Sequence, residues 1–119
     1  MDKEETNTSF GTIKIHRKVI ASIASMACLE TEGVSRLYNR FTFKIFKLLE
    51  NKQENAIGVE IYKNGEISLN IPIIVKYGYN IPEVAYKVQE NVQSALEKMT
   101  NMTVRYINII VKGVERSAV

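Results

Sequence analysis

The strongest structural signal in the sequence is the segment 80–99, NIPEVAYKVQENVQSALEKM, which has the pattern of a long amphipathic helix. Its apolar residues recur at three- and four-residue spacing and line one face, as expected of a helix that packs on a core. Asn80 followed by Glu83 is typical of an N-terminal capping box, and Pro82 is tolerated in a first helical turn. This helix requires an apolar surface, which the strands predicted on both sides of it can supply.

Two strands are predicted ahead of the helix, at 56–62 (AIGVEIY) and 66–77 (EISLNIPIIVKY), joined by Lys-Asn-Gly at 63–65. An Asn-Gly pair usually indicates a two-residue turn. That register would place the apolar residues of the two strands on opposite faces. A three-residue loop with its glycine at a bulge instead pairs Ile61 with Ile67 and keeps both apolar sets on one face. We predict the bulged hairpin, because a one-residue slip would turn a whole face over.

Pro72 lies inside the second strand and has no N–H to donate to a ladder. The hairpin ladder should therefore end near Ile57, and the second strand should continue alone or beside another neighbour.

Three further elements are predicted. GTIKI (11–15) alternates like a short strand. A helical pattern begins at about Arg17 and ends at EGV, where Gly33 can adopt a left-handed conformation. The segment TVRYINIIVKGV closes the chain as a last strand.

The order strand, helix, strand, strand, helix, strand predicts an α+β fold. We expect a mixed sheet of about four strands with two main helices packed on one face, and the 34–55 connection could add a short third helix. Residues 11–115 are predicted to form a single domain. Residues 1–10 read as a disordered acidic tail and residues 116–119 as a second tail.

Composition restricts the class of protein. The chain has 119 residues, a net charge of only +3 with both signs spread along it, and Cys28 as its single cysteine. An intramolecular disulfide is thus excluded, and a reducing compartment is expected. The N-terminus has no apolar segment of the kind found in secretory signals. We expect a cytoplasmic protein that a partner can bring to the inner face of the membrane.

Residues capable of chemistry are few. His16 is the only histidine and stands where a helix N-cap is expected, and Cys28 falls on the apolar face of the first helix. No second histidine is available for a metal site, and the glycines are too scattered to form a phosphate-binding loop. The sequence predicts a protein that is not an enzyme and has no cofactor and no metal.

One segment, residues 34–49, combines four basic residues and no acidic residue with many apolar ones. A basic amphipathic stretch suits an anionic lipid surface or an acidic protein partner. The alternative is a third helix that packs on the core with its lysines in water. For the first interpretation, the candidate contact residues are Arg36, Arg40, Phe43, Lys44, Phe46 and Lys47.

The face of the sheet away from the helices is a second candidate surface. If Ile107, Ile109 and Val111 face the helices, apolar residues of the opposite parity must face away. Several adjacent apolar residues on such a face indicate a covered surface. Either the middle segment of the chain folds over it or another subunit does, as expected of a homo-oligomer. The candidate self-association residues are Tyr62, Ile74, Tyr106 and Ile110.

Taken in order, the motifs GTIKI…VIASIA, EGV, GVEI, VKYGYNIPEVAYKVQENV and VRYINIIVKGV resemble the alkaline shock protein family, the Asp/Gls-type general-stress or envelope stress response proteins of Gram-positive and related bacteria. The resemblance covers residues 11–115. It implies a small non-enzymatic cytoplasmic protein of envelope stress or lipid homeostasis that self-assembles and binds a membrane-anchored or cytoplasmic partner, with peripheral contact to anionic lipid. The family has no catalytic residues to transfer.

A small nucleic-acid-binding module, for RNA in particular, is the alternative function, because small helix-on-sheet domains often bind nucleic acid. The sequence disfavours it, since it has no GXXG loop and the aromatic residues of its strands do not follow the pattern of RNA-binding sheets.

Overall fold

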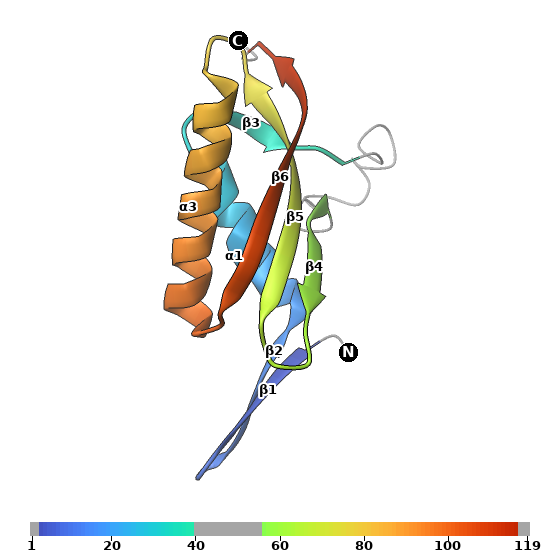
Figure 1. Cartoon of the computed structure of the whole chain (residues 1–119), viewed down its shortest axis with the longest axis vertical. Helices are drawn as coiled ribbons and strands as arrows, with labels where there is room; N and C mark the ends of the chain where they lie inside the picture. Colours follow the sequence, from blue (N-terminus) through green and yellow to red (C-terminus); the bar gives the residue numbers. More distant parts are fainter. Residues whose placement is uncertain (1–2, 40–55, 117–119) are drawn as a thin grey trace.

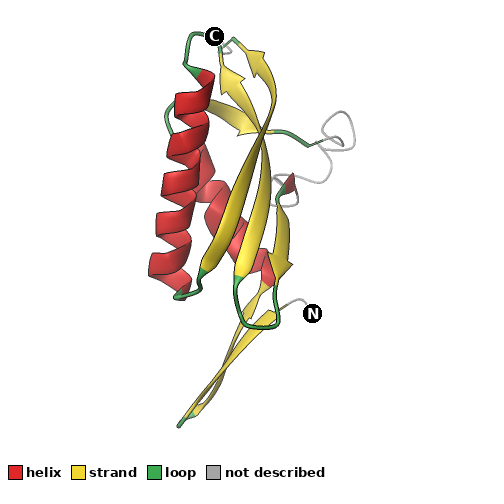
Figure 2. Ribbon diagram, in the orientation of Figure 1, coloured by secondary structure: helices red, strands yellow, loops and turns green. Residues whose placement is uncertain are grey.

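The computed structural model describes residues 3–39 and 56–116 and has the predicted α+β architecture (Figure 1). Its elements, in chain order, are β1 (Lys3–Thr8), β2 (Gly11–His16), α1 (Arg17–Leu29), β3 (Val34–Leu37), β4 (Gly58–Ile61), β5 (Ile67–Lys76), α3 (Ile81–Thr100) and β6 (Val104–Glu115). They form a four-stranded mixed sheet with two helices, and a separate two-stranded hairpin that leaves the body of the protein (Figure 2).

Strand β5 is the centre of the main sheet. Strand β6 pairs with it in parallel along its whole length, while β4 and β3 pair antiparallel with the first and second halves of its other edge. Pro72 lies between these two halves, and its carbonyl accepts the Tyr38 N–H at 2.9 Å. The strand was predicted to continue past Pro72 either alone or beside another neighbour, and the structure shows the second alternative, with β3 as the neighbour.

The register of the β4–β5 hairpin is the predicted one. Ile61 pairs with Ile67 and Val59 with Leu69, and the ladder ends at Gly58, next to the predicted end at Ile57. Gly65 has a φ of 88°, a left-handed conformation that suits glycine at the bulge of a three-residue loop. The apolar pattern of the strands has therefore overruled the usual preference of Asn-Gly for a two-residue turn.

The core lies between the main sheet and the two helices. Alternate residues of β5, from Ile67 to Val75, are fully buried against apolar residues of α1 and α3. Small residues of α1, such as Ala24, let this helix approach the sheet closely. The buried face of α3 is formed by Val84, Val88, Val92 and Leu96. Both helices thus cover the same face of the sheet.

The helix ends follow the predicted capping. The Asn80 side chain accepts the Glu83 backbone N–H at 3.0 Å and so begins α3. Asn101 ends α3 in a left-handed conformation with a φ of 63°. His16 is the N-cap residue of α1, as predicted, but its side chain makes no capping hydrogen bond. Gly33 has a φ of 98° in the turn between α1 and β3.

Two segments differ from the prediction. Residues 3–8, predicted as part of a disordered tail, form β1, which pairs antiparallel with β2 from Lys3↔His16 to Thr8↔Gly11. The hairpin is held by backbone hydrogen bonds, which do not depend on apolar side chains. In addition, β2 is not a member of the main sheet. Its expected place as the fourth strand is taken by β3, which lies in the segment predicted to be a long connection or a helix.

Candidate functional site

The candidate functional site is the face of the main sheet opposite the helices, which we call the open sheet face. It consists of the residues of β5 and β6 whose parity is opposite to that of the core residues, with Tyr62 after β4: Tyr62, Ser68, Asn70, Pro72, Ile74, Tyr106, Asn108 and Ile110. In the part of the chain that the structure describes, the two helices pack on the other side of the sheet. The exposed members of this face can therefore contact other molecules.

One end of the open sheet face holds a cluster of hydroxyl groups. The Tyr62 hydroxyl lies 2.9 Å from the Ser68 hydroxyl and donates to the Tyr106 hydroxyl at 3.3 Å. The hydrogen bond from Tyr62, with a smaller contribution from Ser68, lowers the pKa of Tyr106 from its ordinary value. The Arg105 guanidinium lies 3.7 Å from the centre of the Tyr62 ring and donates to Glu66 at 2.9 Å. These contacts fix Tyr62 and Tyr106 in position.

The middle of the open sheet face presents paired amides and apolar side chains. Asn108 donates to Asn70 at 2.9 Å across the parallel β5–β6 pair. Next to this pair, Ile110 lies opposite Pro72. Tyr106 and Ile110 are 42% and 40% exposed. They lie on β6, two residues before and two residues after Asn108, and so share its face. A surface of this kind, apolar but with satisfied amides, suits contact with protein.

At the other end of the open sheet face, charged side chains are paired with one another or with an aromatic ring. Glu115 accepts hydrogen bonds from Ser35 and from Arg36, whose Nε lies 3.3 Å from the carboxylate. These two hydrogen bonds, that from Ser35 first, lower the pKa of Glu115. Lys112 lies over the Tyr38 ring at 5.3 Å. The cations at this end are thus engaged by partners within the chain.

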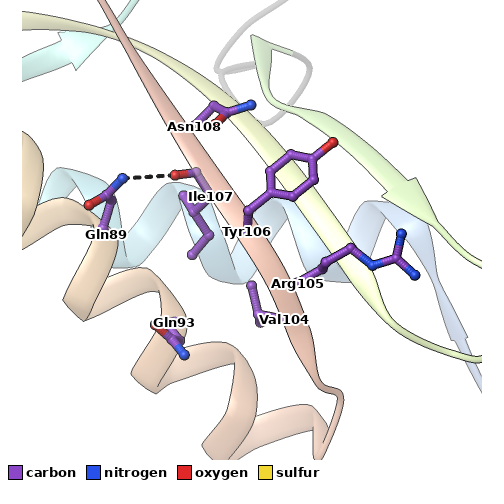
Figure 3. Close-up of a pocket in the computed structure, with 7 residues that line it drawn as sticks. All are labelled: Gln89, Gln93, Val104, Arg105, Tyr106, Ile107 and Asn108. Atoms are coloured by element: carbon purple, nitrogen blue, oxygen red, sulfur yellow. Dashed lines mark hydrogen bonds between the residues drawn. The ribbon is translucent and has the colours of Figure 1, made fainter.

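Beside the open sheet face runs the outer edge of β6, with which no other strand pairs in residues 3–39 and 56–116. The Gln89 side chain of α3 donates to the Ile107 carbonyl at 2.9 Å, which shows that this backbone group points outward (Figure 3). An open pocket of about 320 Å³ adjoins it, lined by Gln89, Gln93, Val104, Arg105, Tyr106, Ile107 and Asn108. Amide side chains beside the edge of a strand suit contact with the main chain of another polypeptide.

The predicted self-association residues all lie at the open sheet face, but they differ in accessibility. Tyr106 and Ile110 are exposed and Tyr62 is half-buried. Ile74 is buried, and its Cδ1 lies 3.4 Å from the point where a Cβ on Gly113, its partner in β6, would stand. Ile74 therefore does not contribute exposed apolar area. A bulge near Gly113 also reverses the parity of β6, so that Val114 lies opposite Val75, a core residue, rather than on the open sheet face.

The structure describes one residue of the predicted basic contact set. Arg36 lies on β3, where it pairs with Glu115. The other five residues, Arg40, Phe43, Lys44, Phe46 and Lys47, lie outside the residues that the structure describes. Their role in contact remains a prediction.

Sequence reasoning missed several residues of the site, among them Arg105, Gln89 and Gln93. Arg105 lies at an irregularity in the β5–β6 register, which brings it and Tyr106 together beside Tyr62. The alternation of the strand gives no sign of this bulge. Gln89 and Gln93 are one helical turn apart in α3, and this spacing could have indicated a shared polar edge.

Residues with reactive groups lie away from this face. Burial raises the pKa of the Cys28 thiol to about 12, so Cys28 is held as a protonated apolar side chain. Within the described residues, no three His, Cys, Asp or Glu side chains gather closely enough to hold a metal ion. None of the helices described there has the length and apolar composition needed to cross a membrane.

Comparisons with known proteins agree on a family. Residues 5–116 match the model of the alkaline shock protein 23 family, which is described as having a cell envelope-related function. The uncharacterized protein YqhY of Bacillus subtilis is 31% identical over 116 residues, covering 97% of this chain and 84% of that protein. The uncharacterized protein YloU of the same organism is 33% identical over 113 residues, covering 92% of this chain and 93% of that protein.

Solved structures resemble the fold without sharing the sequence. A structure titled MamM-CTD 215-293 superposes with a TM-score of 0.51 at 13% identity, covering 82% of this chain and 99% of that chain. At this identity the likeness concerns only the arrangement of helices and strands.

Proposed function

The chain belongs to the alkaline shock protein 23 family, which has a cell envelope-related function, and we propose that it acts there without catalysis, by self-association and by binding protein partners at the cytoplasmic side of the membrane. The proposal includes the finer role expected from the sequence, in envelope stress or lipid homeostasis.

The open sheet face and the adjoining edge of β6 carry this proposal. Strand β6 has twelve residues, and its outer edge pairs with no strand among the described residues, so it is a template for another chain. Lys112 and the nearby bulge protect its second half, because charges and bulges on an edge strand hinder pairing. The first half exposes Tyr106 and Ile110, and its outward carbonyl at Ile107 is bonded by the Gln89 side chain. Protein contact is therefore favoured at residues 105–110.

The charges of the face favour protein over nucleic acid. Arg105 is paired with Glu66 and Arg36 with Glu115. Binding to nucleic acid depends on cations that neutralise phosphates, and these two are already neutralised by carboxylates. The alternative RNA-binding function therefore gains no support from this surface.

The double substitution Tyr106→Ser with Ile110→Ser tests the proposal. Losing two exposed apolar anchors, each contributing about 1 kcal/mol or more, should weaken self-association by roughly ten- to a hundredfold. Sedimentation velocity over a concentration series measures the change. Tyr86→Ser with Met99→Ser is the matched control, because these residues are exposed on α3. Equal behaviour of both double variants would remove the open sheet face from the mechanism.

Contact of the basic segment with the membrane is a separate prediction. Lys44→Glu with Lys47→Glu should weaken binding to anionic phospholipid vesicles, because each basic residue near such a surface contributes about 1 kcal/mol. Vesicle co-sedimentation at low and high salt measures it, with far-UV circular dichroism as the control for folding. Unchanged binding would assign this segment no role at the membrane.

A further inference from the structure

Two irregularities in β6 delimit a regular stretch at the outer edge of the main sheet. In the pairing of β6 with β5, the register skips Arg105 and Lys112, so each is the extra residue of a bulge. Both cations lie over tyrosine rings, Arg105 at 3.7 Å from the centre of the Tyr62 ring and Lys112 at 5.3 Å from that of Tyr38. Bulges and charges hinder pairing at an edge. The stretch between them, 106–111, pairs regularly with β5 and has no charged side chain.

The first bulge changes the direction in which the backbone of β6 points. Before it, the Thr103 carbonyl faces β5, where it accepts the Ile67 N–H at 3.0 Å. After it, the Ile107 carbonyl faces away from β5 and accepts the Gln89 side chain of α3 at 2.9 Å (Figure 3). Both residues are odd-numbered, and successive residues of a strand alternate in direction, so one extra residue between them accounts for the reversal.

The same alternation sets the direction of the other backbone groups in the stretch. Ile109 and Val111 have the parity of Ile107 and direct their N–H and C=O groups outward, whereas the even-numbered residues direct theirs at β5. No strand of residues 3–39 and 56–116 pairs with this outer edge. Donors and acceptors at every second residue are matched by the main chain of an added strand. The hydrogen-bonding pattern of the edge therefore selects an extended polypeptide.

Side chains on the two sides of the edge specify the residues of such a polypeptide. Tyr106 and Ile110 are exposed on the open sheet face, so every second residue of an added strand would lie beside them and should be apolar. On the side of α3, Gln89 and Gln93 line the open pocket of about 320 Å³ (Figure 3). Amides donate and accept hydrogen bonds, so the alternate residues should be uncharged and polar.

We propose that residues 106–111 of β6 receive a short extended segment of a protein partner as an additional strand, and that this segment displaces the Gln89 side chain from the Ile107 carbonyl. The segment alternates apolar with uncharged polar residues and spans about 20 Å, at about 3.3 Å per residue. This inference rests on the proposed binding of protein partners and specifies how the edge of β6 takes part in it.

Amide hydrogen exchange on the wild-type protein tests the direction of the backbone. The N–H groups of Ile109 and Val111 should exchange at least about tenfold faster than those of Asn108 and Ile110, which face β5. Protection of Ile109 and Val111 at every protein concentration would show that the chain itself covers the edge. Protection that develops only at high concentration would assign the edge to a second copy. Either result would overturn the proposal.

The peptide acetyl-KTVTVTVK-amide is the probe for strand addition, because it alternates valine with threonine and its lysines keep it soluble. At millimolar concentration it should shift the amide NMR signals of Ile107, Ile109 and Val111 more than any others. Two analogues are N-methylated, one at the valines and one at the threonines. One of them should lose the effect, because only alternate N–H groups of a strand face its neighbour. Absence of these shifts, or equal shifts with both analogues, would disprove strand addition.

The substitution Gln89→Ala tests the displacement of this side chain. Without a competing donor at the Ile107 carbonyl, the variant should bind the peptide about two- to tenfold more tightly than wild type, the equivalent of one hydrogen bond. Ser94→Ala, at an exposed position of the same helix, is the control and should bind with the affinity of wild type. An affinity that is unchanged or lower in Gln89→Ala would refute the competition.

These outcomes are distinguishable from those that test self-association. A protein that stays monomeric at every concentration but binds the peptide at 107–111 would retain strand addition and lose the proposed self-association. A protein that assembles but does not respond to millimolar peptide would retain self-association and lose strand addition.

Discussion

Replacing Ile71 by alanine is expected to lower the free energy of unfolding by about 2–5 kcal/mol, the range for deleting a large aliphatic side chain from a packed core. Ile71 is fully buried at the centre of β5, opposite Ile109 of β6, and faces both helices. A domain of this size has a total stability of about 5–15 kcal/mol. Urea unfolding followed by circular dichroism measures the loss.

Ile110→Ala is the control for this experiment. Ile110 lies on the neighbouring strand but on the open sheet face, 40% exposed. In dilute, monomeric protein its substitution should cost less than about 1 kcal/mol, because part of the side chain is already in water. Comparable losses for Ile71→Ala and Ile110→Ala would contradict the assignment of the two faces of the sheet.

Replacing Gly33 by alanine should also destabilise the protein strongly, by about 2–5 kcal/mol, the sum of a backbone cost and a packing cost. Its φ of 98° is costly for a residue with a Cβ, by about 1–2 kcal/mol. A Cβ there would lie 2.6 Å from Val84 Cγ2 and 3.0 Å from Tyr79 Cδ2, so these side chains or the turn itself would have to shift. Overpacking of this kind costs about 1–3 kcal/mol more. Thermal and urea unfolding report the sum.

Gly78→Ala separates the two contributions to this effect. Gly78 has nearly the same φ, 99°, but a Cβ placed on it meets no atom within 4 Å. This variant should therefore show the backbone cost alone, about 1–2 kcal/mol. If Gly33→Ala were no more destabilising than Gly78→Ala, close packing of the α1–β3 turn against α3 would be disproved.

The hairpin and the long helix could be predicted from sequence because local rules determine them. The alternation of apolar residues in β4 and β5 allows one register for a shared apolar face, and that register is observed. Asn80 and Glu83 likewise define the start of α3 through neighbouring backbone groups. In both cases the information lies within a few residues of the element.

Strands β1 and β3 could not be predicted, because their pairing carries little local signal. The sequence of β1, KEETNT, has no apolar alternation, and only its ladder with β2 makes it a strand. The four residues of β3, VSRL, form a strand because β5 offers them an edge beyond Pro72. That edge is created by the fold, in which β4 occupies only half of β5.

The candidate site was partly accessible to the same reasoning. Parity along β6 correctly placed Tyr106 and Ile110 away from the helices. Burial of Ile74 was not predictable, because its neighbours in the sheet, Arg36 of β3 and Gly113 of β6, are set by the tertiary structure. The position of β6 at the edge of the sheet, as far as residues 3–39 and 56–116 define it, was also missed, since strand order in a sheet is a property of the tertiary structure.

Self-association through the open sheet face is the central claim, and light scattering on the purified wild-type protein across a concentration series tests it most directly. The predicted result is a mean molar mass that rises with concentration above the 13.5 kDa of one chain. A constant mass of one chain at every concentration would contradict the claim.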